Sequence, residues 1–213
     1  AGRGSNKRYL PAGGQAAPPM DVGARSSSFI LFDTEYTAWE GSMARGWSGP
    51  GEYRELVQIG AVRVENQTLA ELDAFTVFVK PEKNPTLSDF FINLTGISQE
   101  TVDQEGLRFP EAIKRFAAWV GDDLLFSWGG DAAVLEENSA FHGMPSPLPI
   151  HRCSDIRPLF RDAGIATDGY ASSTIVRAFG HEPTRRAHHA LNDARQILDA
   201  LRLLKARIDA PAP

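Results

Sequence analysis

Two carboxylates, Asp33 and Glu35, stand one residue apart at the end of the apolar run 29–32, where a buried strand is expected. Successive side chains of a strand point to opposite faces, so both acids share a face with Phe29 and Leu31, the face that packs into the core. Removing unpaired carboxylates from water is costly and raises their pKa toward neutrality. The pattern therefore predicts a bound cation, with a solvated surface pair as the alternative.

Two further acids stand at the ends of expected elements. Asp131 follows the short strand 124–128 through two glycines and precedes a helix, at the sheet edge where α/β sites gather; an ordinary helix N-cap is the alternative. Asp193 lies in the first turn of the last helix, four residues before Ile197 and eight before Leu201, so it points toward the apolar stripe. Its alternative role is to complement the helix N-terminus.

His188 lies five residues before Asp193, a separation that would put the two side chains on different faces of one helix. His188 is therefore expected in the loop that enters the last helix. Its unperturbed pKa of about 6.5 lets a histidine exchange protons near neutral pH, and adjacent His189 is the competing candidate. Four carboxylates and one histidine suit Mg²⁺ or Mn²⁺. Two such ions about 3.5–4 Å apart can activate a water and stabilise the leaving oxygen of a phosphodiester, with the histidine deprotonating that water.

Length and composition restrict the class of protein. The 213-residue chain, 42% hydrophobic, suffices for one α/β domain with a single core. Its net charge of −5 argues against coating long stretches of nucleic acid by charge, but not against holding a few nucleotides through metal ions. The single cysteine, Cys153, fits a reducing, cytoplasmic location. No apolar run approaches the ~20 residues that span a bilayer, so no membrane association is expected.

The apolar periodicity predicts an antiparallel three-strand meander followed by alternating helices and strands. Strands are expected over 29–36, 56–64, 72–79, 124–128 and 150–154. Helices are expected over 87–94, a short segment capped by Ser98, 110–120, 131–137, 156–162, 172–179 and 191–208. This is an α/β fold with a mixed five-stranded sheet and helices on both faces. Residues 1–28 and 209–213 are expected to be tails of a single domain over 29–208.

Three motifs resemble those of the DEDDh family of 3′→5′ exonucleases: Phe-Asp-Thr-Glu-Tyr at 32–36, the later Asp131, and His-His-Ala-Leu-Asn-Asp at 188–193. Segments 37–41, 56–62 and 94–97 are similar to the subgroup that trims histone messenger and small RNAs, and to its bacterial relatives. The resemblance covers about residues 29–204 and implies a ribonuclease H-like fold. Many relatives have an aromatic residue before the second acid, where this chain has Gly130. Asp122 and Asp123 are therefore alternatives to Asp131, although they precede the strand.

The resemblance implies a role for each matching residue. It makes four acids the ligands of two Mg²⁺ or Mn²⁺ ions, Asp33, Glu35, Asp131 and Asp193, and His188 the general base. It places the terminal nucleotide against Thr34, Tyr36, Thr37 and Ile97. Trp39 is expected either to stack on a base or to pin the long loop 38–51 to the core. Arg186, with Arg185 beside it, is a candidate phosphate contact, a solvated charge pair being the alternative.

The leading hypothesis is a metal-dependent exonuclease that acts on the 3′ ends of single-stranded nucleic acid and releases nucleoside 5′-monophosphates. RNA is favoured over DNA through the subgroup resemblance. A binding or polymerase-associated subunit of the same fold that has lost activity is the main alternative, and the intact set of five residues argues against it. A Mg²⁺ phosphatase that hydrolyses small phosphoesters is a third possibility. The sequence leaves the oligomeric state undetermined.

Overall fold

The computed structural model describes residues 26–148 and 150–210, so most of the two expected tails lies outside the described residues. The strands are β1 (Ser28–Tyr36), β2 (Leu56–Glu65), β3 (Glu71–Lys80), β4 (Leu107–Arg108), β5 (Leu125–Ser127) and β6 (Cys153–Asp155). The α-helices are α1 (Asp89–Thr95), α2 (Gln99–Glu105), α3 (Phe109–Val120), α4 (Asp131–Phe141), α5 (Arg157–Asp162) and α6 (Ala190–Asp209). Two short 3₁₀ helices are η1 (Ile150–Arg152) and η2 (Ile175–Phe179).

One mixed sheet with the strand order β4-β3-β2-β1-β5-β6 organises the described part of the chain. Strands β1, β2 and β3 form the expected antiparallel meander, and β5 and β6 run parallel to β1. The expected count of five strands was wrong by one. Strand β4 has only two residues, too few for a periodic pattern, and pairs in parallel with the end of β3.

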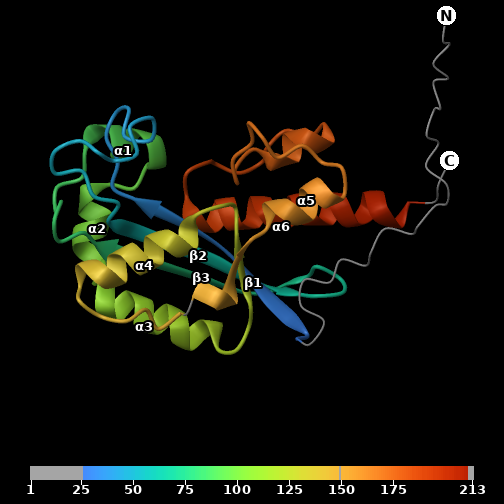
Figure 1. Ribbon diagram of the computed structural model, residues 1–213, viewed down its shortest axis with the longest axis horizontal. Coiled ribbons are helices and arrows are strands. Elements are labelled where there is room, and N and C mark those ends of the chain that lie inside the picture. Colours follow the sequence, from blue (N-terminus) through green and yellow to red (C-terminus); the bar gives the residue numbers. More distant parts are fainter. Residues whose placement is uncertain (1–25, 149, 211–213) are drawn as a thin grey trace, which may run out of the picture.

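Helices cover both faces of the sheet, as expected (Figure 1). Phe29 and Leu31 of β1 pack toward the apolar stripe of α6, which contributes Ala194, Ile197, Leu201 and Leu204. The alternate residues Ile30 and Phe32 pack toward α3 and α4 on the other face. Asp33 and Glu35 continue the Phe29–Leu31 row, so the prediction that they share its core-facing side is confirmed.

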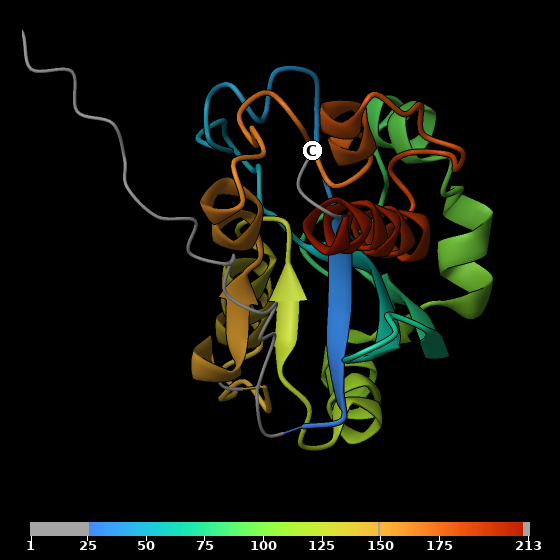
Figure 2. The ribbon, with the colours of Figure 1, turned by 90° about the vertical axis from the view of Figure 1, so that its right-hand side faces the viewer.

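The loops that follow β1 and β5 gather at one end of the sheet. Loop 38–51, helix α1 and the loop before η2 surround this end, and α6 crosses over β1 close to it (Figure 2). Since β1 and β5 are parallel, their carboxyl ends meet there. This is the edge at which α/β folds place their functional groups.

Two expected elements differ from those observed. The expected helix 172–179 is reduced to η2, because residues 171–174 form a turn in which Thr174 Oγ1 accepts the N–H of Ala171 at 2.9 Å. The expected strand 150–154 is β6, shifted toward the carboxyl end after η1. No helix in the described residues is long and apolar enough to span a membrane.

Candidate active site

The last residues of β1 carry two buried carboxylates at the end of the core-facing row of side chains. Asp33 is 7% exposed and Glu35 is 8% exposed, although neither belongs to an ion pair among the described residues. Burial of two unpaired acids on one face is costly, so the solvated surface pair that the sequence allowed is not what the structure shows. The two acids therefore call for a compensating cation, and the elements packed on this face contribute further groups that could bind one.

Helix α6 approaches β2 closely enough to deliver the next acid. Gly60 is the cross-strand partner of Asp33, and a Cβ at Gly60 would lie 2.0 Å from the backbone nitrogen of Leu191. The first turn of α6 therefore rests directly on the backbone of β2, which only glycine permits. Asp193, in this first turn and 4% exposed, is thereby directed at the β1 carboxylates, in agreement with its predicted orientation.

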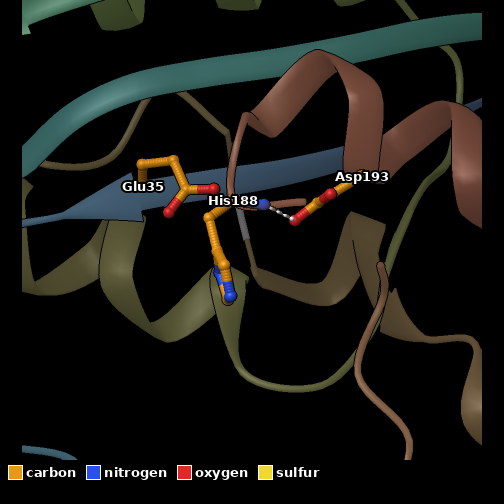
Figure 3. A group of neighbouring side chains, drawn as sticks. All are labelled: Glu35, His188 and Asp193. Carbon is orange, nitrogen blue, oxygen red and sulfur yellow. Dashed lines mark hydrogen bonds between the residues drawn. The ribbon is translucent and has the colours of Figure 1, made fainter. Parts of the chain in front are cut away.

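The segment that enters α6 carries the two histidines. His188 has a positive φ of 59°, and its backbone N–H donates to Asp193 Oδ2 at 3.1 Å. Ligand atoms of Glu35, His188 and Asp193 all lie within 4.8 Å of one another. Figure 3 shows His188 between the two carboxylates. His189 turns the other way, and its Nε2 hydrogen-bonds to Gln58 Nε2 at 3.1 Å.

Asp131 reaches the site from the opposite side, at the first turn of α4. It is not the N-cap of that helix, a position held by Gly130. Its Oδ1 instead accepts the backbone N–H of Thr34 at 3.1 Å and the hydroxyl of Thr34 at 2.6 Å. The alternative acid Asp123 lies at the other end of β5, where it accepts from Ser28 and pairs with Arg63. Asp131 is therefore the acid from this region that joins the dyad.

The four carboxylates change one another's acidity. Burial first, then the neighbouring carboxylates, raise the pKa values of Asp33 and Glu35 well above the usual range. Burial raises the pKa of Asp131 to about 6, against the opposing hydrogen bonds from Thr34, and that of Asp193 to about 7. Burial lowers the pKa of His188, which favours the neutral imidazole.

The donor set fits a hard divalent cation. Mg²⁺ and Mn²⁺ prefer carboxylate oxygens, and acids from β1, α4 and α6 converge here. A cation bound among them removes both the desolvation cost and the mutual repulsion that raise the pKa values of these acids. The imidazole of His188 lies at the border of the same group, close enough to act on a water bound there.

These groups line a cavity of about 360 Å³ at the carboxyl end of the sheet. Its acidic side consists of the four carboxylates and His188, and the rest is apolar or aromatic apart from Arg54 and a few hydroxyl groups. The lining residues outside the acidic side include Tyr36, Met43, Trp47, Arg54, Phe91, Leu94, Trp128 and Ser172. The cavity thus has an acidic side and an apolar wall.

The sequence model of an exonuclease family, RNase_T, matches residues 30–201. The chain belongs to this exonuclease family. The three motifs that resemble those of the DEDDh exonucleases lie within the matched residues. The match covers most of the chain and includes all five residues of the acidic side.

Individual relatives agree with the family assignment. Human 3′-5′ exoribonuclease 1 is 36% identical over 91 residues, which are 42% of this chain but only 24% of the human protein. The probable 3′-5′ exonuclease KapD of Bacillus subtilis is 23% identical over 88% of this chain and 91% of its own length. The nuclease domain of 3′hExo, a DEDDh family member bound to rAMP, superposes with a TM-score of 0.74 at 24% identity, covering 88% and 96% of the two chains.

The predicted nucleotide contacts differ in their positions relative to the cavity. Thr34 and Tyr36 line the cavity, but Thr37, Trp39, Ile97 and Arg186 are outside its lining. The hydroxyl of Thr37 instead donates to the carbonyl of Tyr53 at 2.5 Å, which joins the two ends of the segment between β1 and β2. Ile97 is buried with Phe91 and Val57. Arg186 is exposed and lies over Gly96, where a Cβ would be 2.1 Å from its Nη2.

Trp47 and Arg54 are among the cavity residues that the sequence prediction did not include. Trp47, not Trp39, lines the cavity, and its Nε1 donates to the carbonyl of Thr37 at 2.9 Å. The long loop carries both tryptophans, and no local pattern tells which one folds back. Arg54 forms a bidentate ion pair with Glu137, and its guanidinium carbon lies 5.9 Å from the Tyr36 ring centroid and 5.8 Å from that of Trp47. Its position depends on contacts 83 residues apart in sequence, for which a single sequence gives no signal.

Proposed function

We propose that the exonuclease removes nucleotides from the 3′ ends of single-stranded nucleic acid in a metal-dependent reaction, with RNA favoured over DNA. One observation carries the proposal. Four carboxylates from three elements and an imidazole meet on one side of a cavity whose other wall is apolar. Acids of this number suit two divalent cations, and an apolar wall suits a nucleobase.

The reaction follows from the positions of these groups. Asp33, Glu35, Asp131 and Asp193 would hold two Mg²⁺ or Mn²⁺ ions, which would supply Lewis-acid stabilisation of the phosphate oxygens. His188, kept neutral by burial, accepts a proton from the attacking water. The water oxygen bonds to the phosphorus of the last phosphodiester, and the bond from phosphorus to the 3′ oxygen breaks. The products are a nucleoside 5′-monophosphate and a strand shortened by one nucleotide.

The cavity supports a single unpaired nucleotide as the substrate group. Its volume of about 360 Å³ falls at the lower end of the range for small-ligand pockets. Trp47, Phe91 and Leu94 line it and offer an apolar surface to a base of any sequence. RNA is favoured because the relatives that are at least 30% identical include the 3′-5′ exoribonuclease 1 of human and mouse.

The test uses 5′-labelled RNA and DNA oligomers of one sequence, incubated with Mg²⁺, with Mn²⁺ or with EDTA. We expect a ladder that shortens from the 3′ end, faster on RNA, absent in EDTA and absent with Asp33→Ala. Asp122→Ala is the matched control, because this acid is exposed and lies outside the cavity. Oligomers that stay intact with both metals would overturn the proposal, as would phosphate release from simple phosphoesters without any shortening.

The two neighbouring histidines provide a second arm of this test. His188→Ala is expected to remove most turnover, since a nitrogen of its ring lies within 4.8 Å of carboxylate oxygens of Glu35 and Asp193. His189→Ala is expected to retain most of it. Equal losses from the two variants would contradict the assignment of His188 as the base.

A further inference from the structure

A buried amide connects β2 to the segment that carries the two histidines. Gln58 is 0% exposed and is the cross-strand partner of Glu35. It does not line the cavity, so it touches neither the proposed substrate nor the reacting atoms. Fully buried polar side chains need hydrogen-bond partners, and both ends of this amide have them.

The partners fix the orientation of the Gln58 amide. The backbone N–H of Ala190 can only donate, and it lies 2.9 Å from Gln58 Oε1. The other end is therefore the NH₂ group, which faces His189 Nε2 at 3.1 Å and the hydroxyl of Thr76 at 3.4 Å. An amide flip would place two donors against each other at Ala190, so the backbone decides the assignment.

This orientation in turn fixes the tautomer of His189. Because Gln58 Nε2 donates, His189 Nε2 must accept, and the proton of the neutral ring lies on Nδ1. The lone pair of Nε2 is thereby engaged, and Nδ1 has none to offer. His189 consequently lacks a free basic nitrogen, which explains physically why only one of the two adjacent histidines can act as a base.

Hydrogen bonds from Asp193 and Gln58 also fix the backbone around His188. His188 has a φ of 59°, a left-handed conformation that a non-glycine residue keeps only when its surroundings impose it. Its backbone N–H donates to the carboxylate of Asp193. Two residues later, the backbone N–H of Ala190 donates to the side-chain oxygen of Gln58. The segment 188–190 is therefore clamped between α6 and β2.

We propose that Gln58 is a positioning residue of the exonuclease, which orients His188 by holding Ala190 and keeps His189 from competing as a base by engaging its Nε2. This inference rests on the proposed function in one respect, the role of His188 as general base. The state of His189 can be observed without any catalysis.

The test compares three variants of the full chain. Gln58→Met removes both hydrogen bonds at similar volume. Gln58→Glu keeps an acceptor for Ala190 but removes the donor to His189 Nε2, so it separates the two contacts. Gln196→Met is the matched control, because Gln196 is also a buried glutamine, 2% exposed, whose Oε1 has no hydrogen-bond partner within residues 26–148 and 150–210.

We expect Gln58→Met to lower kcat on a labelled RNA oligomer about 10- to 100-fold, the usual effect of losing a group that orients a catalytic ligand, with KM nearly unchanged. Gln58→Glu should restore most of kcat, because it still accepts the N–H of Ala190 that positions His188, although His189 should then carry its proton on Nε2. Gln196→Met should leave kcat unchanged. Thermal unfolding of each variant separates misplacement from loss of folded protein. Unchanged kcat in Gln58→Met, or a loss shared by Gln196→Met, would overturn the proposal.

Nitrogen-15 NMR of the imidazoles gives a readout independent of turnover. In the wild type, Nε2 of His189 should show the shift of a non-protonated ring nitrogen and Nδ1 that of a protonated one. Gln58→Met should mix the two tautomers. A protonated Nε2 in the wild type would refute the inference whatever the activity. Failure of the proposed function would be recognised separately, by an active enzyme in which His188→Ala has no effect.

Discussion

The backbone N–H of His188 donates to the side chain of Asp193 at 3.1 Å, so the residue proposed as the base and an acid proposed as a metal ligand are fixed to each other. The carboxylate thereby does two things: it holds the left-handed turn that enters α6, and it presents its other oxygen to the site. Asparagine at this position can still accept the N–H of His188 with its one acceptor oxygen. Its other end is an NH₂ group, which cannot bind a metal ion as a carboxylate oxygen does.

Asp193→Asn is therefore expected to separate folding from catalysis. Burial raises the pKa of Asp193 to about 7, so ionising it above that pH costs folding free energy. Replacement by a neutral amide should increase the free energy of unfolding at pH 8 without metal by about 1–4 kcal/mol, from about 1.4 kcal/mol per unit of pKa shift. Activity should be lost. Urea unfolding in EDTA measures the first effect, and a destabilised variant would contradict it.

The same reasoning gives the pH dependence of the wild type. Asp131 and Asp193 have pKa values of about 6 and about 7 in the folded chain, above the value of about 3.9 for an unfolded aspartate. The folded state thus binds more protons between these limits, and the stability of the metal-free protein should fall as the pH rises from about 4 to 7. Saturating Mg²⁺ should stabilise more at pH 8 than at pH 5. Equal metal effects at both pH values would contradict this.

Much of this site was accessible from the sequence because its parts follow local rules. The side-chain alternation of a strand placed Asp33 and Glu35 on the core face, and the helical spacing to Ile197 turned Asp193 toward them. The nucleotide contacts follow no such rule. Which tryptophan of the loop 38–51 turns inward depends on a hydrogen bond from Trp47 to Thr37. The two-residue strand β4 is defined only by its pairing with β3.

Gly60→Ala tests the close approach of α6 to β2. The added Cβ would lie 2.0 Å from the nitrogen of Leu191 and 2.4 Å from the carbonyl carbon of Ala190, both backbone atoms that cannot move aside alone. We expect a loss of about 1–3 kcal/mol in the free energy of unfolding, typical of overpacking, together with a large loss of activity as Asp193 shifts. Urea unfolding and the oligomer assay measure the two effects.

Gly130→Ala is the stability control for this substitution. Gly130 has a φ of −93°, and nothing lies within 4 Å of an added Cβ there. Its free energy of unfolding should stay within about 0.5 kcal/mol of the wild type, as for an uncrowded surface change. If both glycine substitutions destabilise equally, the loss at Gly60 is not specific to the contact with α6.

Trp47→Leu and Trp39→Leu compare the two tryptophans of the loop. Only Trp47 lines the cavity, so only its replacement should weaken binding of a single-stranded oligomer, by the loss of about 1–3 kcal/mol expected for one stacked base. Fluorescence anisotropy with the inactive Asp33→Asn background and Ca²⁺ measures affinity without cleavage. A larger loss from Trp39→Leu would show that the loop adopts a different arrangement on the nucleic acid.

Arg54→Met tests whether the arginine of the cavity contacts a substrate phosphate. Its guanidinium is held by Glu137 and lies over the rings of Tyr36 and Trp47, so it is preorganised rather than free to search for a partner. Release of counterions by one phosphate contact contributes about 0.7 to the slope of log K against log salt for a single strand. We expect Arg54→Met to reduce the slope by about that amount and to weaken binding.

Arg108→Met, at an exposed arginine outside the cavity that pairs with Glu82, should leave the slope unchanged. Weaker binding at an unaltered slope would instead show that Arg54 only supports the two rings.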